Sequence, residues 1–499
     1  MVRNSANQGP YCHHEKNEDE RIHLIHAPAF SCSFEPFMTA YIVCYISNSP
    51  ISHYRGILTC YANEEWVIWM KCHIACEKSK EPHIYIPDIL LEDWMLKGGV
   101  TLSVGATSAR VECLLSPTDD LILTTFLPWL QALHDRDFHI HVDRLRAEIC
   151  IGPITAILIN KTPGSLGDYA HECHQFFHQN GGLLYLLPVS SFFQREGTGL
   201  LFSEGRWEAG SVPSPGVLYN RIPSRKLETT DHFKHAVTSL EEAGATVFNT
   251  RFLSKSEVDQ ALKNHPLLKE HIPVSASGLE HLEGMLSSFG DVFIKDIHGS
   301  KGRNIIRATS GDRWEVRQNS FPGNDHQTFR DYRSLEKKVR AWCRDSTYLI
   351  QETIPFCLYE GRPLDFRILC HRIGQEWTVL SSVARIAGDG EFVSNVDRGG
   401  QTAKPRTILN KILPVSKGIH ENMKALSLSA AVYLSEVLEG RFSEFGIDLG
   451  IDADGKPWII EVNSKPSKLT SQHSESVRPS VRGLYHHSVS VWKEEEEEK

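Results

Sequence analysis

Two carboxylates and one amide near the end of the chain have the types and spacing of a metal–phosphate site. Asp448 precedes Glu461 by thirteen residues, and Asn463 follows Glu461 by two. Residues 447–452 and 457–462 are predicted strands, and the Asp-Gly turn between them favours a hairpin that returns Glu461 to Asp448. Glu461 and Asn463 then share a face. Three oxygen ligands on one patch suit Mg²⁺ carrying nucleotide phosphates; a hairpin with solvated acids is the alternative.

Upstream elements have residues that could bind the nucleotide itself. A predicted strand ends at Lys295 and runs into a glycine-containing loop at residues 298–304. Such a loop can offer backbone N–H groups to phosphates, and Lys295 would add a point charge. A plain hairpin turn is the alternative. The strand predicted at residues 348–354 begins with apolar residues and continues into polar ones, including Gln351 and Glu352. The backbone of such a strand could hydrogen-bond an adenine edge.

Arginines follow in series before the carboxylates. Asp365 and Arg367 alternate onto one face of a predicted strand, Arg385 lies on the next strand, and Asn395 and Arg398 close this block. Arginine recognises phosphate and carboxylate groups through paired N–H donors. The series therefore suits a polyphosphate or carboxylate substrate, and a set of cross-strand salt bridges is the alternative.

Size and charge bound the possible functions. The chain has 499 residues, enough for two or three domains, and a formal net charge of −9. This charge argues against nucleic-acid or anionic-membrane binding as the main role. Residues 1–21 lack a signal-peptide core, and the longest apolar stretch, around residues 37–46, is too short to span a bilayer. We therefore expect synthesis in the cytoplasm and retention inside the cell, without a membrane span.

Two groups of side chains could bind an additional metal. They are Cys72, His73 and Cys76 in one group, and His171, Cys173, His174 and His178 in the other. The first group has too few ligands for a structural zinc site, which normally needs four. In the second, three histidines share one face of a predicted helix. We expect most of the twelve cysteines of the chain to be reduced, small apolar residues, and a functional metal in either group is the disfavoured alternative.

The pattern of elements changes near residue 151. Short apolar runs broken by turns fill the region before it, which predicts a β-rich accessory domain. Strands and helices then alternate, which predicts a small parallel α/β unit without a G-x-G-x-x-G motif. The predicted strands are at 154–159, 183–187, 217–220 and 246–249, and the predicted helices are at 168–179 and 231–243.

The order of these parts over residues 251–466 resembles the ATP-grasp superfamily. The closer resemblance is to the YheC/YheD family of endospore coat-associated ATP-grasp proteins, in its longer YheD-like form. It is carried by residues 217–225, Phe248-Asn249, Gly361 to Arg367, Phe445 to Asp452, Glu461 to Pro466, Arg478-Pro479-Ser480 and Gly483-Leu484-Tyr485.

The resemblance implies a mixed α+β and α/β architecture. An ATP-grasp fold, in which two α+β subdomains grip ATP, would follow a Rossmann-like pre-ATP-grasp unit and the β-rich N-terminal domain. The expected boundaries are a disordered N-terminus at 1–20, the β-rich domain at 21–150, the pre-ATP-grasp α/β domain at 151–250, the ATP-grasp domain at 251–492 and an acidic tail at 493–499.

The resemblance also implies roles for single residues. The expected nucleotide-binding residues are Lys255, Lys295, Gly299, Ser300, Gly302, Gln351, Glu352 and Asp365. The expected metal ligands are Asp448, Glu461 and Asn463, and the expected catalytic residues are Arg367, Arg385, Asn395 and Arg398. Three positions depart from the family pattern: Ser254 stands where Asp is frequent, Asp296 where Pro is common, and Asn304 where Gly is usual.

By this resemblance, we expect an ATP-dependent carboxylate–amine or carboxylate–thiol ligase. It would use ATP with Mg²⁺ or Mn²⁺, form an acyl phosphate on an unknown carboxylate substrate, and pass the acyl group to an unknown nucleophile. A non-catalytic spore coat scaffold that binds ATP and a phosphotransferase are the alternatives. Spore coat proteins are expected partners, association with the spore coat is the expected location, and nucleic acid is not expected to bind.

Overall fold

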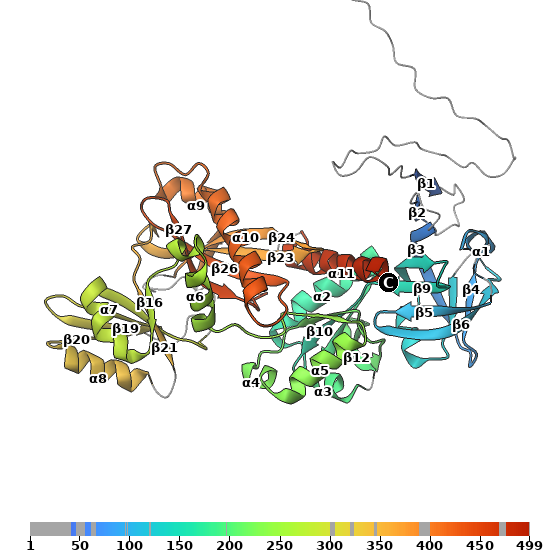
Figure 1. Ribbon diagram of the computed structural model, residues 1–499, viewed down its shortest axis with the longest axis horizontal. Coiled ribbons are helices and arrows are strands. Elements are labelled where there is room, and N and C mark those ends of the chain that lie inside the picture. The colour runs from blue at the N-terminus through green and yellow to red at the C-terminus, as the bar shows by residue number, and fades with distance from the viewer. Residues whose placement is uncertain are drawn as a thin grey trace, which may run out of the picture. The chain divides into compact units, whose positions relative to one another are not determined.

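The computed structural model describes residues 41–45, 55–60, 66–94, 96, 98–118, 121–195, 197–299, 305–319, 324–343, 347–388, 400–468 and 476–498. The chain divides into two compact units (Figure 1). The first contains Met1–Ser103 and Ala109–Ile151, and the second contains Val104–Ser108 and Gly152–Lys499. The predicted disordered N-terminus at residues 1–20 lies outside the described residues.

The first unit is built on a sheet with the strand order β1-β2-β3-β7-β4-β6-β5-β9-β8. Its strands are β1 (Tyr41–Tyr45), β2 (Arg55–Cys60), β3 (Trp66–Glu77), β4 (His83–Ile86), β5 (Gly99–Val104), β6 (Thr107–Leu115), β7 (Leu121–Thr124), β8 (Arg136–Asp143) and β9 (Glu148–Gly152). Helix α1 (Asp88–Trp94) and a 3₁₀ turn (Pro128–Leu133) complete it. Buried side chains alternate along β4, which is the pattern of a strand with one face on a core.

The second unit begins with a six-stranded sheet in the order β13-β12-β11-β10-β14-β15. The strands are β10 (Ile154–Ile159), β11 (Leu183–Pro188), β12 (Thr198–Ser203), β13 (Arg206–Ser211), β14 (Val217–Asn220) and β15 (Thr246–Phe248). The four predicted strands are found and pair in parallel. The antiparallel hairpin β12–β13 was not predicted.

Helices connect these strands. They are α2 (Gly167–Asn180), α3 (Val189–Gln194), α4 (Arg225–Glu228) and α5 (Asp231–Glu242). Helix α2 ends where Gly181 takes a left-handed conformation, and Thr230 caps α5 by accepting a hydrogen bond from the amide of Phe233. The predicted helices are therefore confirmed to within a residue or two.

A third sheet has the order β16-β21-β17-β18-β19-β20. It contains β16 (Ser275–Ser277), β17 (Asp291–Asp296), β18 (Ile305–Thr309), β19 (Trp314–Asn319), β20 (Asn324–Phe329) and β21 (Tyr348–Glu352). Helices α7 (Leu282–Phe289) and α8 (Tyr332–Trp342) bury their apolar sides against one face of it. Val292 and Ile294 of β17 face this core, so Phe293 and Lys295 lie on the opposite face.

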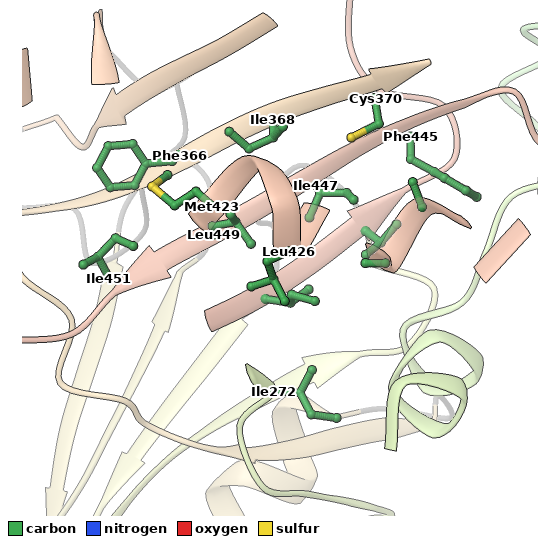
Figure 2. Packing of buried hydrophobic residues seen from close by; sticks show 14 of the residues in the cluster. Ile272, Phe366, Ile368, Cys370, Met423, Leu426, Phe445, Ile447, Leu449 and Ile451 are labelled. Atoms are coloured by element: carbon green, nitrogen blue, oxygen red, sulfur yellow. The ribbon is translucent and has the colours of Figure 1, made fainter. Parts of the chain in front are cut away.

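The fourth sheet has the order β25-β24-β23-β26-β27, all antiparallel, with β22 (Leu358–Tyr359) paired to β23. Its strands are β23 (Arg362–Ile373), β24 (Glu376–Ile386), β25 (Gln401–Ala403), β26 (Glu444–Ile451) and β27 (Pro457–Asn463). Helices α6 (Lys255–Asn264), α9 (Pro405–Ile412) and α10 (Ile419–Val437) contribute to its core. Figure 2 shows Met423 and Leu426 of α10 beside alternate residues of β23 and β26, such as Phe366 and Ile447.

The last helix, α11 (Pro479–Glu498), packs against α2 and β23. It extends through most of the predicted acidic tail at 493–499, where Gln375 Nε2 donates to a Glu494 carboxylate oxygen at 3.0 Å. Glutamate is a good helix former, so the run prolongs the helix. In the part of the chain that the structure describes, no helix has the length and apolar character needed to cross a membrane.

Candidate nucleotide and metal site

One face of the β23–β27 sheet is polar because alternate residues of neighbouring strands fall in register. Asp448 of β26 lies directly opposite Glu461 of β27 on one side and Arg367 of β23 on the other. Opposed residues of antiparallel strands place their side chains on the same face. The other face carries the apolar core, with Ile447 and Leu449 buried. The predicted hairpin is therefore confirmed, and it brings Asp448 beside Glu461.

A β-bulge lets β27 serve both faces. Asp448 pairs with Glu461, but the next residue, Leu449, pairs with Ile459, so Ile460 has no opposite residue. Ile459 consequently stays buried in the core while Glu461 turns to the polar face. Asn463 lies two residues beyond Glu461, on the same face. Bulges of this kind often re-aim side chains near functional sites.

Arginines surround Asp448. Arg367 donates to both carboxylate oxygens, through Nε and through Nη2, the latter at 2.8 Å. Arg385 Nη2 lies 3.0 Å from Asp448 Oδ2, and Arg385 also donates to both oxygens of Asp365, at 2.5 and 2.6 Å. Burial raises the pKa of Asp448, but the two guanidinium groups more than offset this and hold that pKa below its usual value.

Lys255 joins three segments of the second unit. Its Nζ lies 3.1 Å from Glu461 Oε1 and donates to the carbonyl oxygen of Gly299, in the loop that follows β17. Lys255 is the first residue of α6, and Ser254 caps that helix in a capping box with Glu257. The serine that departs from the family pattern thus starts the helix that presents Lys255.

Lys295 lies on the face of the third sheet opposite α7 and α8, and it donates to Gln351 Oε1 at 2.5 Å. Burial lowers the pKa of Lys295 to about 8, an effect that Lys255 strengthens and Glu461 opposes. The loop beyond it begins with Asp296, whose carboxylate accepts from the amide of His298 at 2.8 Å. This Asx-type contact gives the second departure from the family pattern a role in turning the loop.

Glu352 is the last residue of β21, and it is held by Val274, the residue that precedes β16. Its amide donates to the carbonyl of Val274 at 2.9 Å, and its carboxylate accepts from the Val274 amide at 2.7 Å. Gln351 and Asp365 are buried. Four predicted site residues, Ser300, Gly302, Asn395 and Arg398, lie outside the described residues, as does the departure at Asn304.

Two buried ion pairs near the end of β27 were not predicted as part of the site. Lys465 Nζ contacts Glu228, and Lys468 Nζ contacts Glu444. Burial lowers the pKa of Lys465 to about 7, although Glu228 opposes the shift. The signal for Lys465 in the sequence was the run from Glu461 to Pro466, which marked a family resemblance without indicating which acid this lysine would meet.

Gly446 was also missed as a site residue. It lies on the polar face beneath Arg367, and a methyl group there would come within 2.7 Å of Pro466 Cβ and 3.2 Å of Arg367 Nη1. The absence of a side chain therefore leaves room for the guanidinium group. Only the pairing of β26 with β23 reveals this requirement.

The two alternative metal clusters have other contacts. The rings of His171 and His174 pack on Phe202, with centroids 4.3 and 5.3 Å apart. Cys72 is buried, and Cys76 Sγ donates to the carbonyl of Leu130 at 3.4 Å. Among the described residues, no three His, Cys, Asp or Glu side chains converge on a point where they could hold one ion.

The donors on the polar face nevertheless fit a hard cation. Asp448, Glu461 and Asn463 offer carboxylate and amide oxygens from adjacent strands on one face, and Mg²⁺ prefers such ligands together with phosphate oxygens. Two protein carboxylates suffice for Mg²⁺ when substrate phosphates and water complete the coordination. The site residues present therefore fit a Mg²⁺–nucleotide complex.

Comparison with known proteins places the chain among ATP-grasp proteins. It is 26% identical over 427 residues to the endospore coat-associated protein YheD of Bacillus subtilis strain 168, which covers 80% of this chain and 91% of that protein. It is 24% identical over 251 residues to a probable alpha-L-glutamate ligase of Legionella pneumophila strain Corby, which covers 49% of this chain and 68% of that protein.

A solved structure of the ATP-grasp ligase PsnB with a minimal precursor is similar with a TM-score of 0.40 and 15% identity, over 67% of this chain and 99% of that one. A family model described as YheC/D like ATP-grasp matches residues 244–490. Residues 244–490 therefore have the ATP-grasp fold that the motifs predicted, and this part of the chain belongs to the YheC/D-like ATP-grasp family.

Proposed function

We propose that this protein is an ATP-dependent ligase. A substrate carboxylate would take the γ-phosphoryl group of ATP to give an acyl phosphate and ADP, and an amine or thiol would then displace inorganic phosphate to form the product. The observation that carries the proposal is the register that sets Asp448 opposite Glu461 and Arg367, with Lys255 bridging Glu461 to the loop after β17. Basic side chains and the acidic side chains that would bind the metal thus lie beside one another, an arrangement that supports phosphoryl transfer.

Each group has a share in this chemistry. Lys255 and Lys295 would bind phosphates, and the backbone near Gln351 and Glu352 would hold the adenine. Arg367 and Arg385 would bind the transferring phosphoryl group and the substrate carboxylate, as bidentate donors do. Asp448, Glu461 and Asn463 would hold Mg²⁺, which neutralises phosphate charge when bound. No protein nucleophile is needed, so catalysis consists of positioning and charge stabilisation.

The similarity to a probable alpha-L-glutamate ligase supports an amino acid as one substrate. The name of the YheD relative supports a location at the endospore coat. A scaffold that binds ATP without turnover and a phosphotransferase are the rivals, and each predicts a different outcome of one assay.

The assay measures ADP release by the full chain with Mg·ATP and pooled amino acids and peptidoglycan-derived acids, followed by mass analysis of the products. We expect stimulated ADP release and a condensed product. Glu461→Ala should lower the rate by on the order of 100-fold or more without loss of fold, while Glu436→Ala, at an exposed position on α10, should not. Turnover of Glu461→Ala equal to wild type would remove the metal assignment. If the added acids do not stimulate ADP release, the scaffold is favoured. If a phosphorylated acid is the final product, the phosphotransferase is favoured.

A further inference from the structure

The carboxylate of Asp448 is almost fully occupied by protein donors. An ionised carboxylate has about four lone-pair positions. Arg367 takes two of them through Nε and Nη2, and Arg385 Nη2 approaches a third at 3.0 Å. The Asp448 side chain is only 7% exposed. A metal ion could therefore bind Asp448 fully only after at least one guanidinium group moved away.

Charge disfavours a bare cation at this point. Arg367, Arg385, Asp365 and Asp448 contact one another and together are neutral. A divalent ion entering alone would lie beside two guanidinium groups and would leave any arginine it displaced without a counter-ion. Uncompensated charge in a partly buried site is strongly unfavourable. A nucleotide brings phosphate oxygens, and these can receive the arginine that the metal displaces.

Arg367 is the group best placed for such an exchange. Its side chain is 20% exposed, and among the described residues its Nη1 has no hydrogen-bond partner. Arg385, by contrast, also holds Asp365 through two hydrogen bonds. Gly446 beneath Arg367 leaves space around the guanidinium group. One donor is thus free to meet a phosphate before the contacts to Asp448 break.

We propose that Arg367 is an exchangeable counter-ion of Asp448: it keeps free divalent metal away from Asp448 and releases that carboxylate when nucleotide phosphate takes over its guanidinium group. Metal and nucleotide then bind with positive coupling. This inference rests on the proposed function for the identity of the ligand, and it adds the order in which the site fills.

The test measures Mn²⁺ binding to the full chain by the loss of the free-ion EPR signal, with and without the slowly hydrolysed analogue AMP-PNP. Calorimetry measures AMP-PNP binding in parallel. For the wild-type protein without nucleotide, we expect weak binding of Mn²⁺. The complex of protein and AMP-PNP should bind Mn²⁺ at least about tenfold more tightly than either the protein or AMP-PNP does separately. Equal Mn²⁺ affinity of the protein with and without nucleotide, where calorimetry shows that AMP-PNP binds, would overturn the inference.

Variants isolate the residue. Arg367→Gln should raise the affinity for Mn²⁺ alone by about tenfold or more, and the added change Asp448→Asn should abolish that gain. Arg372→Gln is the matched control, because Arg372 lies on the same strand and its side chain donates to Gly374 and Gln375 instead of to Asp448. Unchanged or weaker Mn²⁺ binding by a folded Arg367→Gln would contradict the inference. If Arg367→Gln does not fold, the wild-type coupling still decides.

The two proposals can fail separately. If calorimetry detects no AMP-PNP binding to any variant, the proposed function fails, while a gain of Mn²⁺ affinity in Arg367→Gln that needs Asp448 would still support the counter-ion role. If AMP-PNP binds with Mn²⁺ but Asp448→Asn leaves the Mn²⁺ affinity of that complex unchanged, Asp448 is not a ligand. In that case the counter-ion inference falls and the nucleotide site stands.

Discussion

The side chain of Asn249 binds both backbone groups of Glu444. Its Nδ2 donates to the Glu444 carbonyl oxygen at 2.9 Å, and its Oδ1 accepts from the Glu444 amide at 3.1 Å. Oδ1 also accepts from the Ser443 amide, and Nδ2 also donates to the carbonyl of Ser464. Asn249 follows β15, so one buried amide ties the parallel sheet to the start of β26 and the end of β27. Asp448 lies four residues along β26 from this tie.

Removing this amide should destabilise the fold. Asn249→Ala would remove the side-chain partner of the Ser443 amide, of the Glu444 amide and carbonyl, and of the Ser464 carbonyl. It would also place alanine at a φ of 52°. We expect the free energy of unfolding to fall by about 2–5 kcal/mol, measured by denaturant titration. Asn422→Ala, at an exposed site on α10, should change it by less than about 0.5 kcal/mol. Equal stability of the two variants would show that the amide contacts are dispensable.

A second prediction concerns the space below Arg367. Gly446→Ala would bring a methyl group within 2.7 Å of Pro466 Cβ, a contact that requires backbone or ring movement. We expect a loss of about 1–3 kcal/mol in the free energy of unfolding. Gly284→Ala is the control, since nothing lies within 4 Å of its Cβ position on α7. That change should stabilise the protein by about 0.5–1 kcal/mol. A neutral Gly446→Ala would mean that the strand end adjusts freely.

The third prediction tests the bridge made by Lys255. Lys255→Met removes the contacts to Glu461 and to the carbonyl of Gly299 but keeps the length of the side chain. We expect AMP-PNP binding, measured by calorimetry with Mg²⁺, to weaken by about tenfold or more, because one phosphate cation and one loop contact are lost. Lys269→Met, at an exposed position of the same region, should bind AMP-PNP as the wild type does. Equal affinity of the two variants would remove Lys255 from the nucleotide site.

The parts of the site that sequence could predict are those encoded locally. An Asp-Gly turn between apolar runs predicted the pairing of Asp448 with Glu461, since a hairpin needs only neighbouring residues. The contact of Arg367 with Asp448 joins residues 81 positions apart, and strand patterns do not specify which strands become neighbours. The role of Gly446 depends on the same pairing and was missed for the same reason.

The missed hairpin β12–β13 has a different cause. Its residues are mostly half-buried or exposed, so the alternation of apolar and polar residues is weak. Its turn is formed by Glu204 and Gly205, both with positive φ, and glutamate rarely adopts that conformation. The bulge at Ile460 was likewise hidden, because a period of two along β27 would have placed Ile459 and Glu461 on one face.

The fourth prediction is a pH dependence of nucleotide binding that depends on Lys295. Because burial lowers the pKa of Lys295 to about 8, this side chain is protonated in the free protein below pH 8 and neutral above it. Phosphate binds the protonated form, so nucleotide binding raises this pKa. Affinity for AMP-PNP should therefore be full below pH 8 and fall by up to about tenfold per pH unit above it.

Calorimetry in buffers of different ionisation enthalpy measures the protons taken up on binding. At pH 8, AMP-PNP binding to the wild-type protein should take up about half a proton. Lys295→Met should lose this uptake and bind AMP-PNP more weakly at pH 7, while Lys269→Met should retain both. If proton uptake persists unchanged in Lys295→Met, the proton belongs to another group. Lys295 would then lack the phosphate contact that is expected from its position beside Gln351 and near Glu461.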